Sequence, residues 1–375
     1  MRIVIIVTGL NNGGAERMLF NLAKSYKEKN HQVHVISLLD GGIYKSNLEN
    51  IGIDVRGLGM ERSRLPKFRH VFKLISHVKE IQPNIIQGWM YHGNLLASIA
   101  KFFLPNSVKL FWSVRQTLYS IRKETYLTRV VIYLNIFLSG MPKKIFFNSK
   151  LSQIQHEKKG FSKKNTILVP NGIDFESFRF QVSNRHKYRK RYGVANDIVL
   201  IGNFSRFHPM KNHEMFFNSL AKLPDNIIKK IKVLMAGNGV EISNPFFYDM
   251  QKKFPRDLFV FLGEIKNISE VMNSLDIFCL SSSWGDAFPN ILIEALASEV
   301  FVVSTNVGDA KEIINDYGYI SEINDEEFFS KLLLKSINLN KKNRNEIAKL
   351  GSDHVRKNFD IRNISEQYMS YYRSE

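Results

Sequence analysis

Short apolar runs of strand length recur along the first half of the chain, and stretches with helical spacing separate most of them. This alternation is typical of a parallel sheet that helices cover on both faces. The pattern begins again in the second half, after a polar, strongly basic segment at 184–193 that we interpret as a solvated connector. The predicted strands are 2–7, 32–39, 84–88, 109–114, 144–148 and 165–169, then 198–202, 231–236, 258–262, 276–280 and 300–304.

Two successive units of this kind predict an α/β fold with two doubly wound, Rossmann-like domains, separated near the connector. Open α/β sheets bind ligands beyond the carboxyl ends of their strands. We therefore expect a site shared by two domains that face one another across a deep cleft. The loops that follow the predicted strands are rich in glycine and polar residues, as such a site requires.

The charge of the chain is high and unevenly distributed. The chain has 53 Lys and Arg against 35 Asp and Glu, a formal charge of +18. Residues 1–180 hold 27 basic and 11 acidic residues, whereas 181–375 hold 26 and 24. Codon bias toward lysine is an alternative explanation of the total charge, but it explains the asymmetry poorly. The asymmetry favours an anionic partner of the first domain, either acidic lipid or polynucleotide.

Cysteine content and apolar run length point to the compartment. The single cysteine, Cys279, excludes an internal disulfide and a four-cysteine metal site, and it favours a reducing compartment. The first apolar run stops at Thr8, which is too short for a signal peptide. The longest later run, 130–138, is far below the ~20 residues that cross a bilayer. We expect a cytoplasmic protein that can also lie at the inner face of the membrane.

Glycines follow two of the predicted strands. Gly13 and Gly14 precede a helix expected to begin near Ala15, and consecutive glycines before a helix N-terminus let the backbone approach a phosphate. A tight turn without a ligand explains them equally well, and for Gly237 the turn is the better interpretation. Neither the dinucleotide fingerprint nor the Gly-Lys-Ser/Thr phosphate loop is present, which argues against a nicotinamide dehydrogenase or an ATPase.

Charged residues mark two loops of the second half. Arg206 and Lys211 flank a bend before a helix, and a guanidinium with an ammonium group can neutralise a diphosphate without a metal. Asp286 and Glu294 lie eight positions apart, so both carboxylates can face a ligand at the start of a helix. The alternatives are a solvated cationic loop, and a helix cap with a surface glutamate. Because Asp-x-Asp and paired histidines are missing, we expect no catalytic metal.

In combination, these motifs resemble the retaining glycosyltransferases of the GT-B fold, glycosyltransferase family four (group 1). Asp286 departs from the pattern, because the family usually has glutamate there, as the first of two acids separated by seven residues. The matching segments are Gly13-Gly14-Ala15-Glu16, Trp89-Met90-Tyr91-His92, Val169-Pro170-Asn171-Gly172-Ile173-Asp174, Arg206 with Lys211, and 286–294.

The resemblance implies an acceptor-binding domain at 1–185, a nucleotide-sugar domain at 194–355, and a C-terminal helix at 356–375 that packs back toward the first domain. Arg206 and Lys211 would hold the donor diphosphate, and Glu294 would bind the ribose. His92 would approach the donor sugar, although a satisfied loop histidine is the alternative. The other substrate-binding positions that it implies are Gly13, Gly14, Asn171, Asn203, Gly237, Gly263, Glu264, Ile265, Asp286, Ala287, Phe288, Pro289 and Asn290.

The expected reaction transfers a hexose from a nucleoside-diphosphate sugar, with UDP favoured, to a hydroxyl of a lipid-linked or cell-envelope glycan. The resemblance implies retention of the anomeric configuration, and no cofactor is expected. Alternatives are an epimerase or sugar phosphorylase of the same fold, or a nucleic-acid-binding protein. The last lacks a recognisable single-strand platform or recognition helix, so no nucleic acid partner is expected.

Basic and large apolar residues occur together at 67–79, and again at 101–104 followed by 109–112. Amphipathic segments of this type can lie on anionic membranes, so we expect peripheral membrane contact. The alternative is that these segments pack against the sheet.

Overall fold

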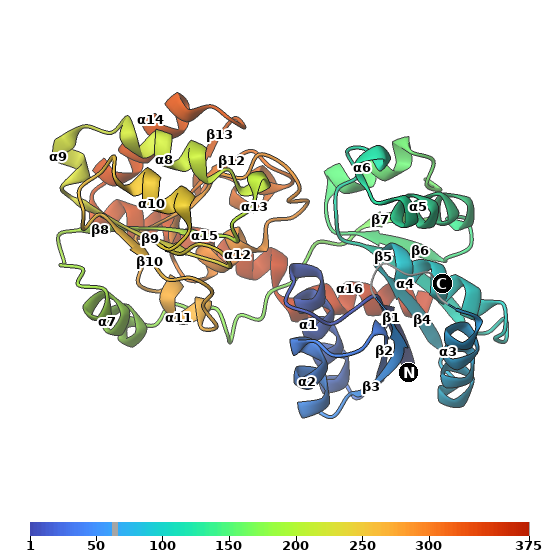
Figure 1. Ribbon diagram of the computed structural model, residues 1–375. Coiled ribbons are helices and arrows are strands. Elements are labelled where there is room, and N and C mark those ends of the chain that lie inside the picture. Colours follow the sequence, from blue (N-terminus) through green and yellow to red (C-terminus); the bar gives the residue numbers. More distant parts are fainter. Residues whose placement is uncertain (62–66, 375) are drawn as a thin grey trace. The chain divides into compact units, whose positions relative to one another are not determined.

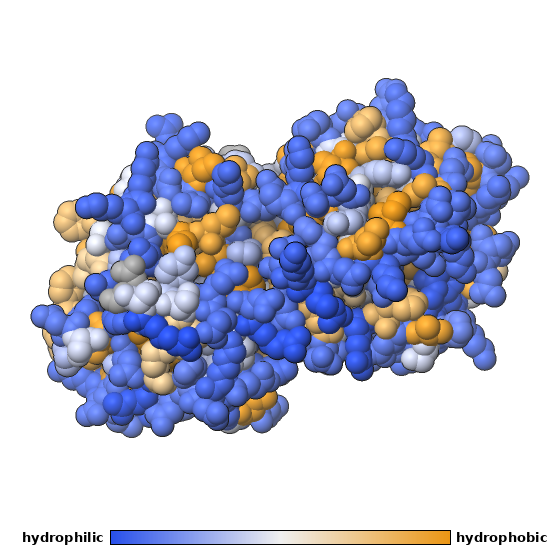
Figure 2. All heavy atoms as spheres, turned by 180° about the vertical axis from the view of Figure 1, so that it is seen from behind, coloured by the Kyte–Doolittle hydropathy of each residue, from blue (hydrophilic) through white to orange (hydrophobic). Residues whose placement is uncertain are grey.

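The computed structural model describes residues 1–61 and 67–374. The chain forms two compact units (Figure 1). The first unit is Met1–Gly172 with Ile361–Glu375, and the second unit is Ile173–Asp360. Figure 2 shows a largely hydrophilic surface on which apolar side chains form separate patches.

The described residues of the first unit form a seven-stranded parallel sheet in the order β3-β2-β1-β4-β5-β6-β7. In β1, Ile3, Ile5 and Val7 point to one face and Val4 and Ile6 to the other, as successive strand residues must. The strands are β1 (Arg2–Val7), β2 (Gln32–Leu39), β3 (Asp54–Met60), β4 (Ile85–Trp89), β5 (Lys109–Val114), β6 (Lys144–Phe147) and β7 (Thr166–Leu168).

Helices cover both faces of this sheet. The apolar core on one face includes α1 (Gly14–Glu28), α2 (Ile43–Asn50) and α16 (Ile361–Ser374). The opposite face carries α3 (Phe68–Ile81), α4 (Met90–Lys101), α5 (Tyr126–Leu138) and α6 (Lys150–Lys158), with the short 3₁₀ turn η1 (Ile121–Lys123) before α5. The loops after β1 and β4 thus diverge to opposite faces, which leaves a crevice at the carboxyl ends of these two strands.

The second unit, within its described residues 173–360, has a six-stranded parallel sheet in the order β10-β9-β8-β11-β12-β13. The strands are β8 (Val199–Phe204), β9 (Ile231–Ala236), β10 (Phe259–Phe261), β11 (Ile277–Leu280), β12 (Phe301–Thr305) and β13 (Gly318–Ser321). One face carries α7 (Val182–Arg191), α11 (Ile268–Met272), α12 (Asn290–Ala297), α13 (Ala310–Ile314) and α15 (Lys341–Phe359). The other carries α8 (His213–Ala221), α9 (Asp225–Ile228), α10 (Pro245–Gln251) and α14 (Glu326–Asn338). The 3₁₀ turn η2 (Pro209–Lys211) precedes α8.

The predicted pair of doubly wound domains is therefore confirmed, but two strands were missed. Gly57 and Gly59 interrupt the apolar pattern of β3, and β13 has only four residues. Both strands lie at the edge of their sheet, where few positions need to be apolar.

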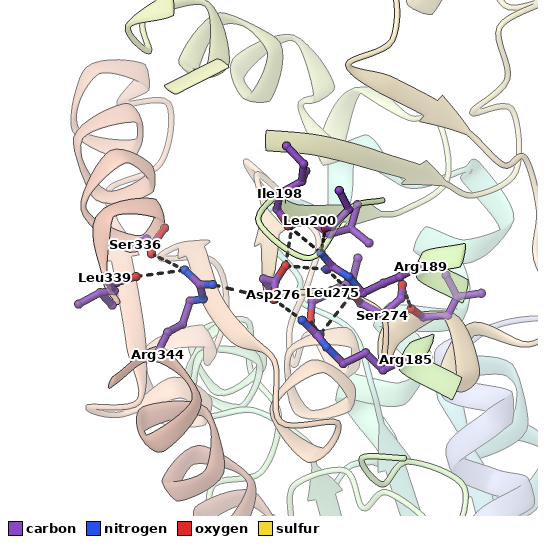
Figure 3. A network of polar contacts seen from close by, with 12 residues as sticks. Arg185, Arg189, Ile198, Leu200, Ser274, Leu275, Asp276, Ser336, Leu339 and Arg344 are labelled. Atoms are coloured by element: carbon purple, nitrogen blue, oxygen red, sulfur yellow. Dashed lines mark hydrogen bonds and ion pairs between the residues drawn. The ribbon is translucent and has the colours of Figure 1, made fainter. Parts of the chain in front are cut away.

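The basic segment at 184–193 is not a solvated connector, so that interpretation was wrong. It forms most of α7, in which Tyr188 and Arg189 are buried. Asp276, at the amino end of β11, binds Arg185 at 2.5 Å and Arg189 at 2.9 Å, and it accepts the Leu200 amide at 2.8 Å (Figure 3). These contacts hold α7 on the second sheet.

The chain passes between the units at Gly172–Ile173 and again at Asp360–Ile361. The sequence pattern predicted a boundary near the connector, and the resemblance implied a single helix over 356–375. The Ile173 amide donates to the Phe359 carbonyl at 2.8 Å, and Ile173 forms an isolated bridge with Asp360. The last helix is thus two helices, of which α15 belongs to the second unit and α16 packs on α1 in the first. Within the described ranges, none of the helices is long and apolar enough to span a bilayer.

Candidate active site

Arg206 and Lys211 follow β8, at the point of the second sheet where the order of strands reverses between β8 and β11. The turn η2 places Lys211, and the His208 side chain accepts the Met210 amide at 3.2 Å to begin this turn. Arg206 is exposed, and its guanidinium lies 3.7 Å from the Met210 sulfur; no ion pair joins it to another described residue. Arg206 can therefore bind an anion without first breaking an ion pair.

Lys211 is paired with Asp286, a contact that the sequence did not predict. The Lys211 Nζ lies 2.8 Å from Oδ1 and 2.6 Å from Oδ2 of Asp286, and both side chains are largely buried. An ammonium group has three N–H donors, so at least one remains for a phosphate oxygen. Asp286 is thus positioned to orient the Lys211 ammonium group.

Glycines bring the neighbouring loops of the second unit together. Gly237 has φ of 142°, and a Cβ there would lie 2.1 Å from the Ser205 carbonyl oxygen, so only glycine permits this approach. The Gly237 amide donates to the Gly263 carbonyl at 2.7 Å, and Asn238 donates to the Glu264 carboxylate at 3.3 Å. The predicted positions after β8, β9 and β10 therefore lie side by side.

The start of α12 is built largely from buried residues. Ala287, Phe288 and Pro289 are buried, and Asn290 is the first residue of the helix. Glu294 is only 2% exposed, so the alternative of a surface glutamate is wrong.

Two of the predicted substrate-binding side chains take part in internal packing. Asn203 is buried in β8 and donates to the Ser281 hydroxyl at 3.4 Å, which ties β8 to the end of β11. The Ile265 side chain packs on the apolar core of the second unit.

In the first unit, Gly13 and Gly14 form the start of α1 at the carboxyl end of β1. Gly13 is the N-cap residue, and a Cβ there would lie 2.2 Å from Oε2 of Glu16. Burial raises the pKa of Glu16, although a hydrogen bond to its backbone lowers it in part. The Trp89 indole donates to the Ala15 carbonyl at 3.1 Å and so ties the end of β4 to this helix start.

His92 is the third residue of α4 and not a loop histidine. Met90, at the start of this helix, has φ of 63°, a strained conformation that often occurs at functional sites. Burial lowers the pKa of His92, so its imidazole is neutral at pH 7. The His92 side chain forms no hydrogen bond with the residues that the structure describes. Together with Asn11 and Glu16 it lines a pocket of about 770 Å³.

Asn171 lies after β7 and is held by Arg115, a residue that the sequence analysis missed. The buried Arg115 guanidinium donates to Oδ1 of Asn171 at 2.6 Å and lies 4.9 Å from the Trp89 ring and 5.7 Å from the Tyr368 ring. Burial lowers the pKa of Arg115 to about 9. An arginine directly after the buried strand at 109–114 was the available signal.

Within the parts of the chain that the structure describes, no three histidine, cysteine or acidic side chains come together as a cation-binding cluster. Arg206 and Lys211 are the basic side chains of the segment between β8 and α8.

Comparisons with known proteins cover nearly the whole chain. Residues 12–177 match the model of Glycosyltransferase Family 4, and residues 184–352 match that of Glycosyl transferases group 1. The chain is 25% identical, over 98% of its length and 97% of the other protein, to GalNAc-alpha-(1->4)-GalNAc-alpha-(1->3)-diNAcBac-PP-undecaprenol alpha-1,4-N-acetyl-D-galactosaminyltransferase of Campylobacter jejuni.

A second relative is UDP-Gal:alpha-D-GlcNAc-diphosphoundecaprenol alpha-1,3-galactosyltransferase of Escherichia coli, which is 26% identical over 48% of this chain and 49% of that protein. The crystal structure of Anabaena Alr3699/HepE in complex with UDP covers 100% of both chains with a TM-score of 0.85 and 21% identity, and so it supports the fold. The two family models match in order and correspond to the two doubly wound sheets. The chain is therefore a glycosyltransferase and belongs to the GT-B glycosyltransferases, with a family 4 first half and a group 1 second half.

Proposed function

We propose that the protein transfers a hexose from a UDP-sugar to a hydroxyl of a lipid-linked or cell-envelope glycan, with retention and without a metal. The placement of Arg206 and Lys211 after β8 carries this proposal, because these cations lie where an open α/β sheet binds its ligand. The names of the two relatives, one a UDP-Gal enzyme and both acting on undecaprenol-linked glycans, support the donor and the acceptor class.

The two cations would act on the leaving group. As the bond between the anomeric carbon and the β-phosphate oxygen breaks, its electron pair stays on that oxygen and negative charge grows on the phosphate. The Arg206 guanidinium and the remaining Lys211 N–H would interact more strongly with this additional charge in the transition state than with the intact donor. This difference lowers the barrier. Amides at the start of α12 add donors of the same kind, and Glu294 would bind the ribose hydroxyls.

The acceptor hydroxyl would attack the face from which the phosphate departs, which retains the anomeric configuration. Its oxygen forms the new bond to the anomeric carbon, and its proton passes to the leaving phosphate oxygen. His92, neutral at pH 7, is suited to accept a hydrogen bond from a sugar hydroxyl. The loop that holds Gly13 and Gly14, together with Asn171, would complete the acceptor side.

Peripheral membrane contact belongs to the same proposal. Helix α3 packs Leu74, Ile75 and Val78 on the sheet, but Phe68 and Phe72 are exposed beside basic side chains. The segment at 67–79 therefore combines packing with a surface suited to anionic lipid at the cytoplasmic face.

The proposal is tested by replacing each cation. We expect Arg206→Ala and Lys211→Ala each to lower kcat about 100-fold or more, because each removes charge stabilisation of the leaving phosphate. The measurement is UDP release and glycan extension with the best donor from a nucleotide-sugar panel.

A matched arginine and lysine pair provides the control. Lys229 and Arg256 are exposed and precede β9 and β10, so they lie at the amino ends of the strands, opposite the ends that Arg206 and Lys211 follow. Lys229→Ala and Arg256→Ala should therefore keep kcat. Near-normal turnover in both Arg206→Ala and Lys211→Ala would refute the assignment. Product analysis that finds an epimerised nucleotide sugar or a sugar phosphate would favour the alternative reactions.

A further inference from the structure

Helix α5 exposes large apolar side chains on the side that faces away from its sheet. Its buried residues are Val131, Ile132 and Asn135. Five others are between 37% and 85% exposed, and their spacing of three and four residues places them along one side of the helix. We call these five residues the α5 stripe: Tyr126, Val130, Tyr133, Leu134 and Phe137.

The α5 stripe carries no available charge. Arg129 is the one charged residue of α5, and its guanidinium donates to the Glu124 carbonyl at 2.7 Å and to the Arg122 carbonyl. The cation is thereby folded back over the start of the helix. A row of exposed apolar side chains without charge is costly in water and marks a surface that contacts something apolar.

The α5 stripe continues into the pocket of about 770 Å³ in the first unit. Tyr126, Val130 and Leu134 belong to both the stripe and the pocket wall. At its other end the pocket reaches Asn11 and His92. One continuous surface therefore runs from exposed apolar side chains to polar groups on the proposed acceptor side.

The chemistry of this surface fits a hydrocarbon chain attached to a sugar. A helix has no unpaired backbone groups along its side, so α5 cannot pair with an extended peptide, whereas a hydrocarbon needs no hydrogen bonds. Asn11 and Glu16 give the pocket side chains that can form hydrogen bonds with the hydroxyl groups of a sugar. The first unit has 28 basic and 11 acidic residues, which complements the phosphate groups of a lipid-linked glycan.

We propose that the α5 stripe and the adjoining pocket bind the hydrocarbon chain of a lipid-linked acceptor, with the polar end of the pocket toward the sugar. This inference rests on the proposed function, because it assumes that the acceptor carries a lipid. The sequence predicted membrane contact for the basic segments near 67–79 and 101–112, whereas this proposal gives lipid binding to α5.

The experiment compares three probes on the full chain by calorimetric titration: farnesyl diphosphate, isopentenyl diphosphate and inorganic diphosphate. We expect farnesyl diphosphate to bind at least tenfold more tightly than the five-carbon probe, because its longer chain buries more apolar surface. The double variant Tyr133→Ser/Phe137→Ser should lose tenfold or more of the farnesyl affinity and keep the affinity for inorganic diphosphate. Both side chains are exposed, so folding is not at risk.

The matched control is Tyr248→Ser/Phe328→Ser, which removes one exposed tyrosine and one exposed phenylalanine from the second unit. It should bind all three probes as the wild type does. Equal farnesyl affinity in the wild type and the α5 double variant would overturn the proposal. So would a wild-type dimer in sedimentation that the α5 variant abolishes, because the stripe would then bind a second copy.

A parallel titration with UDP-sugars separates the two proposals. If UDP-sugars bind and the α5 double variant keeps the wild-type affinity for farnesyl diphosphate, the hydrocarbon site is wrong and the proposed function stands. If farnesyl diphosphate binds through the α5 stripe and no nucleotide sugar binds, the proposed function fails and the apolar site remains.

Discussion

Lys211 and Asp286 show how single side chains are prepared in the proposed donor site. Because both oxygens of Asp286 lie within 2.8 Å of Nζ, the ammonium group is fixed before any phosphate arrives. Asp286 is one methylene shorter than the glutamate that the resemblance implies at this position, and its carboxylate forms an ion pair with Lys211. A fixed cation needs little reorganisation when charge develops on the leaving group.

His213 gives a prediction on pH. Its Nε2 lies 3.1 Å from the Ser205 hydroxyl, and burial, with a smaller effect of Lys211, lowers its pKa to about 4. The unfolded chain takes up a proton near pH 6.5 while the folded protein does not, so stability is lost as the pH falls from 6.5 toward 4. Between pH 7 and 5 we expect His213 to account for ~2 kcal/mol of the lost unfolding free energy.

Urea titrations of wild type and His213→Phe at both pH values test this prediction. Phenylalanine keeps the aromatic contact with Phe247, whose ring centroid is 5.2 Å from that of His213, so the variant should lose ~2 kcal/mol less between the two pH values. His186→Phe, at an exposed position of α7, is the control and should behave as the wild type does. The same loss in wild type and His213→Phe would show that His213 is not responsible.

The sequence indicated candidate site residues where the chemistry is local. Arg206 and Lys211 could be selected because they follow a recognisable strand and precede a helix, and such loops bind ligands. The pairing of Lys211 with Asp286, 75 positions away, could not be predicted, because no periodicity connects distant loops. The same is true of Arg115 and Asn171, which are 56 positions apart.

At the level of elements, Asp276 is the residue that attaches α7 to the second sheet. Burial alone would raise its pKa, but Arg185, Arg189 and the Leu200 amide outweigh burial and hold the pKa below its ordinary value. A third guanidinium, that of Arg344 on α15, lies 3.9 Å away. The stabilisation is therefore present at neutral pH and is lost as the pH falls through the lowered pKa.

We expect Asp276→Ala to lower the unfolding free energy by ~3–5 kcal/mol, because it leaves buried guanidinium groups without a carboxylate. Chemical denaturation at pH 7 measures the change. Asp249→Ala, which removes the exposed pair with Lys252, should produce no measurable change. If both variants unfold at the same denaturant concentration, Asp276 does not hold α7 in place.

Strands and helices were predictable where packing needs apolar residues at regular intervals. β1 is buried on both faces, so its composition is almost wholly apolar, and it was recognised at once. The edge strands β3 and β13 and the basic helix α7 carry weaker patterns. α7 depends on ion pairs with Asp276 rather than on an apolar face, and ion pairs leave no periodic signature.

At the level of the whole molecule, the C-terminal residues complete the first unit. Helix α16 buries Ile364, Tyr368, Met369 and Tyr372 against the first sheet, and Tyr372 donates to Gln87 at 2.5 Å. The core of residues 1–172 is therefore incomplete without a segment that follows the entire second unit in sequence.

Deletion of residues 361–375 should prevent cooperative folding of the first unit and leave the second unit folded, because each unit has its own apolar core. Limited proteolysis with mass spectrometry measures this, with cleavage expected throughout 1–172 and protection within 173–360. Arg373→Ala, which removes only an exposed pair with Glu366, should keep full protection. Protection of 1–172 in the deletion variant would contradict a structural role of α16.

The sequence by itself determined the two doubly wound units, the uneven charge and the cationic loop after β8, because apolar periodicity, composition and strand-to-helix loops are local properties. Only the tertiary structure decided that Asp286 binds Lys211, that Asp276 anchors the basic helix α7, and that α5 adjoins the pocket of His92. These three depend on residues or elements far apart in the chain, and their contacts exist only once the sheets bring them together.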